Sequence, residues 1–138
     1  RMCPRTTEEN VFSFIRAVER GQNREAVTLL NEMLETETEP VRVLAAISGS
    51  FVNIARVKAA EAAGVSRDRL EEEMGYRKGD RALGVAYSNA RRYSQEKIDN
   101  VIYLLNETDR KLKSGAADKR IILEQAMVRL ALIVSGRS

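Results

Sequence analysis

Apolar residues recur at helical spacing through almost the whole chain, and this periodicity limits the possible folds more than any other feature. In the segment after Ser94 the apolar residues lie three or four positions apart, as one buried face of an α-helix requires. No alternating run of β-branched residues bounded by turn residues appears, so strands are not expected. The sequence therefore predicts an all-α fold, a compact bundle of about seven helices without a sheet.

Glycines, prolines and capping side chains mark where these helices begin and end. Ser66, Ser94 and Asp118 can cap helix starts, and single glycines follow several helix ends. The 138 residues suit one domain, which we expect over 8–135, after a linker or disordered remnant at 1–7 and before a tail at 136–138. The expected helices cover residues 8–20, 23–35, 40–63, 66–74, 78–93, 94–114 and 118–135.

The segment 40–63 should form the central helix of the bundle. Its apolar residues spread round much of the helix surface, which is typical of a helix with neighbours on several sides. Ser48-Gly49-Ser50 in its middle predicts a close approach of another helix, with a kink and a ligand site as weaker alternatives. No stretch approaches the roughly 18 apolar residues of a membrane span, so we expect no membrane association.

The sequence lacks the residues on which most catalytic and metal sites depend. It has one Cys and no His, which excludes an internal disulfide, a Cys-rich zinc site and nucleophiles activated by His. The three adjacent acids at 71–73 splay apart on a helix, so we interpret them as solvated surface. The only phosphate-loop candidate, at 77–80, has one glycine and follows no predicted strand. We expect no catalytic residue, no metal and no cofactor.

Basic residues leave a nucleic-acid-binding function open as an alternative. The net charge is +3, and the whole excess lies in the second half of the chain. Residues 66–92 could form a helix-turn-helix, but the acids of its first helix oppose the approach of phosphates. A helical DNA-binding domain that uses residues 76–92 and 110–120 is therefore the second hypothesis. Its basic residues at 76–92 are Arg77, Lys78, Arg81, Arg91 and Arg92.

Two short stretches in the C-terminal half resemble a known family. An Ala-Arg-Arg-Tyr-Ser step at 90–94 opens a helix, which ends in an Asp-Arg-Lys-Leu-Lys-Ser-Gly stretch at 109–115. A capped, Leu-rich helix follows from Asp118. In this order the elements resemble the C-terminal domain of the delta subunit of the bacterial DNA polymerase III clamp loader. The family signature positions are Arg91, Tyr93, Ser94, Asp109, Lys113 and Gly115, for which we expect roles in helix capping and packing.

The N-terminal half agrees with the same resemblance. Asn10-Val11-Phe12 opens the first helix, and a glycine-punctuated hairpin follows. Next come the long helix from Pro40 and the short helix that ends at Met74 and Gly75. The resemblance thus covers nearly the whole chain, from about residue 8 to 135.

The resemblance implies a helical collar that joins clamp-loader subunits into a ring-like pentamer. Its partners would be subunits of the gamma/tau and delta-prime type, and ATP would be hydrolysed by those other subunits. AAA+-type domains ahead of this one would contact the sliding clamp, and contact with DNA would be indirect or weak. The domain would act in the bacterial cytoplasm, as a non-catalytic part of a DNA-directed DNA polymerase holoenzyme. The interface residues we expect on the last three helices are Tyr87, Arg91, Tyr103 and Arg129.

Overall fold

The computed structural model describes residues 7–36, 39–115 and 118–136. Over these ranges it contains seven α-helices, one short 3₁₀ turn and no strand, which confirms the all-α prediction. The elements are α1 (Thr7–Glu19), α2 (Asn23–Thr36), α3 (Pro40–Ala63), α4 (Arg67–Met74), α5 (Arg81–Asn89), η1 (Ala90–Arg92), α6 (Gln95–Ser114) and α7 (Lys119–Ser135).

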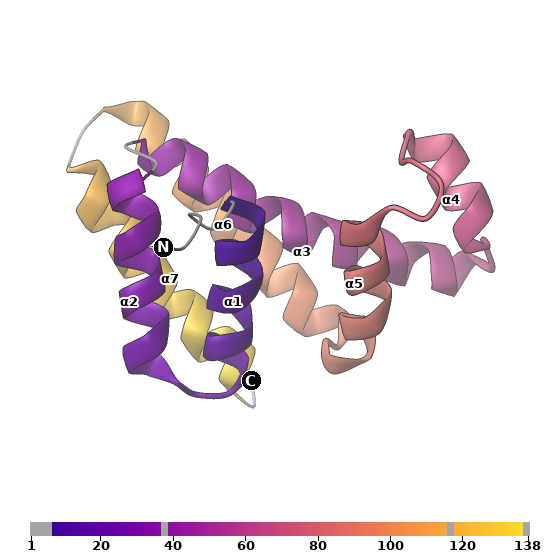
Figure 1. The fold of residues 1–138 in the computed structure, drawn as a ribbon, viewed down its shortest axis with the longest axis horizontal. Coiled ribbons are helices and arrows are strands. Elements are labelled where there is room, and N and C mark those ends of the chain that lie inside the picture. The colour runs from indigo at the N-terminus through magenta and orange to yellow at the C-terminus, as the bar shows by residue number, and fades with distance from the viewer. Residues whose placement is uncertain (1–6, 37–38, 116–117, 137–138) are drawn as a thin grey trace, which may run out of the picture.

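The helices are arranged around α3, which runs along the length of an elongated molecule (Figure 1). The hairpin α1–α2 lies at one end of α3 together with α7, and α6 runs beside α3. The helix α5 packs on the other half of α3, and α4 lies beyond it at the far end. The prediction of a central third helix is therefore confirmed.

The largest difference from the expected boundaries lies at residues 78–93. This segment was expected as one helix, but α5 begins only after Asp80, whose carboxylate accepts a hydrogen bond from the Leu83 amide at 2.9 Å. The chain then passes through η1, and Tyr93 adopts an extended conformation. A cap at Asp80 and the extended backbone at Tyr93 thus shorten the helix at both ends.

The ends of the expected domain fall mostly outside the described residues. Residues 1–6 of the expected linker and residues 137–138 of the expected tail are among the undescribed ones. Thr7, which the sequence assigns to the linker, is the first residue of α1. Asn23 is the first residue of α2, in agreement with the expected start of that helix.

Helix α3 supplies the centre of the hydrophobic core. Val43, Ile47 and Phe51 have no measurable solvent exposure, because neighbouring helices cover this face of α3. By length and mean hydropathy α3 could also cross a membrane, so the expectation that no segment approaches such a span is wrong. The burial of these side chains within the bundle identifies α3 as a core helix.

The expected close approach of a helix at Gly49 is not found. A methyl group added at Gly49 would meet no atom within 4 Å, and the residue is exposed. The buried residues Val43, Ile47 and Phe51 lie on the other side of the helix from Gly49. The prediction was wrong because composition alone does not show which face of a helix is packed.

Candidate functional site

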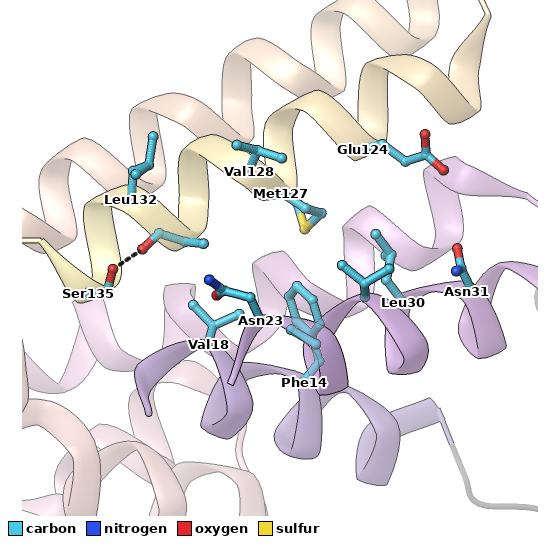
Figure 2. Close-up of a pocket in the computed structure, with 13 residues that line it drawn as sticks. Phe14, Val18, Asn23, Leu30, Asn31, Glu124, Met127, Val128, Leu132 and Ser135 are labelled. Carbon is cyan, nitrogen blue, oxygen red and sulfur yellow. Dashed lines mark hydrogen bonds between the residues drawn. The ribbon is translucent and has the colours of Figure 1, made fainter. Parts of the chain in front are cut away.

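A groove runs between α7 and the α1–α2 hairpin. Its volume is about 530 Å³, and most of its lining is apolar. Phe14 and Val18 of α1 contribute to its lining, with Leu30 of α2 and Met127 of α7 on the two sides (Figure 2). The groove thus combines segments that are about 100 residues apart in the sequence.

Exposed aliphatic side chains border this groove from both walls. On α2, Val27 is 56% exposed, and on α7, Val128 and Leu132 are 62% and 67% exposed. Such side chains are common singly on protein surfaces, but contiguous apolar patches mark sites of interaction. We name this surface the α2/α7 face and define it by Val27, Val128, Leu132 and the groove between them.

The sequence of α7 explains why the face exists. Leu123, Met127 and Leu130 are buried and fix one side of α7 against the bundle. Outside this buried stripe, α7 carries more aliphatic residues, and Val128 and Leu132 are four positions apart on one line. A surface helix normally shows a polar outer face, so α7 is more apolar than packing within this domain requires.

Hydrogen bonds hold the walls of the groove in place. At one end the Arg120 guanidinium donates to the Asn31 side-chain oxygen of α2 at 3.1 Å and pairs with Glu124 at 3.2 Å. At the other end Lys97 of α6 donates to the carbonyl oxygen of Val134 at 3.0 Å. The Arg120–Asn31 bond ties α7 to α2 directly, which fixes the width of the groove at that end.

The expected interface residues lie on other parts of the surface. Tyr103 of α6 is 68% exposed, and Arg91 and Arg129 are exposed as well. Tyr87 is half-buried, with its hydroxyl enclosed and without a hydrogen-bond partner among the described residues. None of the four lines the groove. The sequence signal that could have found the groove is the second apolar stripe of α7.

The signature residue Tyr93 ties the hairpin to the centre of the molecule. Its ring is almost completely buried and meets Phe51 of α3 edge-on, with ring centroids 5.8 Å apart. Its hydroxyl donates to one carboxylate oxygen of Glu19 at the end of α1, and Arg92 donates to the other at 3.1 Å. Burial, together with the hydrogen bond to Glu19, raises the pKa of the Tyr93 hydroxyl far above its usual value.

The other signature residues act locally on helix α6, apart from the exposed Arg91. Ser94 caps its start by accepting a hydrogen bond from the Lys97 amide at 3.0 Å. Asp109 and Lys113 form an ion pair one turn apart at 3.0 Å. Gly115 ends the helix in the left-handed conformation with φ of 73°, which a side chain would strain. In the structure these positions cap or reinforce one helix.

A buried carboxylate on α4 was not expected from the sequence. Glu71 is only 5% exposed, so the interpretation of 71–73 as solvated surface is wrong for this residue. Its carboxylate accepts hydrogen bonds from Arg67 at 2.9 Å and from the Gly79 amide at 3.0 Å. The Arg67 guanidinium also lies over the Tyr87 ring at 5.6 Å. Burial of this carboxylate depends on the later turn at Gly79, which no local pattern reveals.

Among the residues that the structure describes, no three acidic or Cys side chains gather in a way that could hold a metal ion. The fold and the groove together define an all-helical domain with an open apolar groove on its surface. Residues 8–130 match the family model of the DNA polymerase III delta subunit, C-terminal domain. This match covers most of the chain, which therefore belongs to that family.

One relative found by its sequence and one solved structure illustrate the relationship. DNA polymerase III subunit delta of Bacillus subtilis (strain 168) is 25% identical over 129 residues, which is 94% of this chain and 37% of that protein. The solved structure of the Bacillus subtilis DNA clamp loader delta protein superposes with a TM-score of 0.83 at 24% identity, covering 94% of this chain and 38% of that one. The chain thus spans little more than a third of the relatives it matches.

Proposed function

We propose that this domain joins its parent protein to the other subunits of a clamp loader, and that it does so through the α2/α7 face. The observation that carries the proposal is the apolar groove with Val27, Val128 and Leu132 exposed at its edges. Burial of exposed aliphatic side chains is the main favourable contribution to protein association. The family to which the chain belongs supplies the identity of the partners.

The partners in this proposal are clamp-loader subunits of the gamma/tau and delta-prime type. The domain is non-catalytic, and it works in the cytoplasm as part of the replication machinery. Contacts with the sliding clamp belong to other parts of the full-length protein. As a collar, the domain would hold moving ATPase domains at a fixed spacing, so that their nucleotide-driven motion opens the clamp.

The structure supports a rigid role of this kind. The long helix α3 connects the hairpin end of the molecule to α5, and Tyr93 and Glu19 link these two parts a second time. The walls of the groove are also held by hydrogen bonds from Arg120 and Lys97. A preorganised docking surface loses little conformational entropy when it binds, which favours stable assembly.

The test is assembly of the full-length protein with the other clamp-loader subunits, followed by size-exclusion chromatography. Leu132→Asp places a charge in the apolar interface and should remove the protein from the complex. Truncation of a hot-spot residue at the centre of an interface costs about 2 kcal/mol or more, which corresponds to roughly thirtyfold in affinity.

Tyr103→Asp provides the matched control, because Tyr103 and Leu132 are 68% and 67% exposed. Tyr103 lies on α6, outside the groove lining. Assembly should be normal with this variant. If Leu132→Asp assembles as well as the unmodified protein, or if only Tyr103→Asp fails to assemble, the α2/α7 face is not the docking surface.

A further inference from the structure

A second hollow on the opposite side of α1 is rich in arginine. It has a volume of about 360 Å³ and lies where α1, α3, α5 and η1 meet. Four arginines line it, and they come from three different parts of the chain: Arg16 and Arg20 from α1 and the turn after it, Arg81 from α5, and Arg92 from η1. We name this hollow the arginine cleft.

Within the cleft only one carboxylate faces these arginines, and it is already occupied. The two oxygens of Glu19 accept hydrogen bonds from Arg92 and from the Tyr93 hydroxyl. Among the described residues, Arg16, Arg20 and Arg81 form no ion pair. Around this hollow, three positive charges therefore have no ion-pair partner within the part of the chain that the structure describes.

Local helix stability does not account for all of these charges. Arg16 and Arg20 lie at the end of α1, where positive charge favours the helix. Arg81 is the first residue of α5, where the helix dipole disfavours a cation. The cleft also presents the amide of Asn89 and the hydroxyl of Ser50, which can donate further hydrogen bonds. A cleft lined by many hydrogen-bond donors and few acceptors fits a ligand whose polar atoms are mainly hydrogen-bond acceptors.

We propose that the arginine cleft binds the phosphate backbone of a single nucleic-acid strand. Guanidinium groups suit phosphate because their planar donors match two of its oxygens. A strand supplies one negative charge per nucleotide, so successive phosphates can meet the three unpaired arginines. The lining of the cleft also includes the apolar residues Phe12, Ile54 and Val85, on which a base or sugar can pack.

An acidic protein segment fits the cleft less well than a strand does. A hollow of about 360 Å³ is far smaller than the space that an amphipathic helix would occupy. A single acidic side chain that fits inside would leave two of the three charges unpaired. The cleft and the α2/α7 face lie on opposite sides of α1, since Phe14 and Val18 line one and Arg16 and Glu19 the other. Nucleic-acid binding here is therefore independent of the assembly function.

The test measures binding of a fluorescein-labelled oligothymidylate to the full-length protein by fluorescence anisotropy. Three phosphate contacts predict that affinity falls roughly twentyfold between 50 and 200 mM salt. Arg81→Gln should weaken binding roughly tenfold at 50 mM salt and reduce the salt slope by about 0.7. Arg16→Gln combined with Arg81→Gln should reduce the slope by about twice as much. Far-UV circular dichroism checks that each variant is folded.

Arg77→Gln is the matched control, because it removes the same charge from the exposed turn before α5, outside the cleft. It should bind like the unmodified protein. The proposal is overturned if Arg81→Gln binds unchanged, if Arg77→Gln loses as much affinity, or if no salt-dependent binding occurs. It is also overturned if an oligoglutamate peptide binds as tightly and with the same sensitivity to Arg81→Gln, since the cleft would then be a site for acidic protein segments.

Discussion

The hydroxyl of Tyr93 offers a sensitive test of how the two halves of the domain are joined. Tyr93→Phe removes one oxygen and leaves the edge-on packing against Phe51 in place. The lost interaction is a hydrogen bond to the Glu19 carboxylate, whose side chain is only 12% exposed. Hydrogen bonds to charged groups contribute roughly 1.5–3 kcal/mol to stability.

We expect Tyr93→Phe to lower the free energy of unfolding by about 2 kcal/mol, because Arg92 still pairs with Glu19 and water can reach part of the carboxylate. For a chain of 138 residues this corresponds to a fall in Tm of roughly 7 °C. The chain has no Trp, so urea unfolding should be followed by far-UV circular dichroism. Tyr103→Phe, on the exposed surface of α6, should change stability by less than about 0.5 kcal/mol.

The pH dependence of stability tests the same contact independently. Because the folded pKa of Tyr93 is raised, its contribution is fully present below the unfolded pKa of about 10 and is lost as pH rises above it. Between pH 10 and 11 the unmodified protein should lose roughly 1 kcal/mol more than Tyr93→Phe. Equal stability of the two proteins at pH 7, or parallel losses above pH 10, would refute this role of Tyr93.

Three further substitutions test other parts of the fold by urea unfolding. Leu83→Ala empties a fully buried site and should cost about 2–5 kcal/mol; a loss below about 1 kcal/mol would mean that α5 is not packed as described. Asp118→Ala removes the cap that accepts from the amides of Arg120 and Ile121 and should cost about 1 kcal/mol, whereas an unchanged Tm would contradict the cap. Glu71→Gln weakens the bonds to Arg67 and Gly79 and should cost about 2 kcal/mol, with the exposed Glu72→Gln as a control of negligible effect.

The helices could be predicted because their ends are determined locally. Ser66, Ser94 and Asp118 cap helices as their sequence positions indicate, and Gly64 ends α3 in the left-handed conformation. Each of these signals depends only on residues within one helical turn. The helix expected at 78–93 is the exception, because it is shorter than predicted. Asp80 caps its start, and the backbone is extended at the buried Tyr93.

Features that depend on segments distant in the sequence could not be predicted in this way. Burial of Glu71 requires Gly79 of the following turn, and the exposure of Gly49 depends on which side of α3 its neighbours occupy. The groove requires α2 beside α7, and the arginine cleft requires α1 beside α5. Interface residues were therefore sought among Tyr and Arg side chains, whereas the docking face that we propose consists of the exposed aliphatic residues Val27, Val128 and Leu132.

The central claim is that the α2/α7 face becomes buried when the clamp loader assembles, and thiol accessibility measures this directly. Leu132→Cys and, as the control, Tyr103→Cys are introduced separately into the full-length protein after native thiols such as Cys3 are replaced by Ser. The rate of labelling by a maleimide is then measured before and after the other subunits are added. We predict that assembly slows labelling at position 132 at least roughly tenfold and leaves position 103 nearly unchanged. Equal labelling rates at position 132 in the free and assembled protein would contradict the claim.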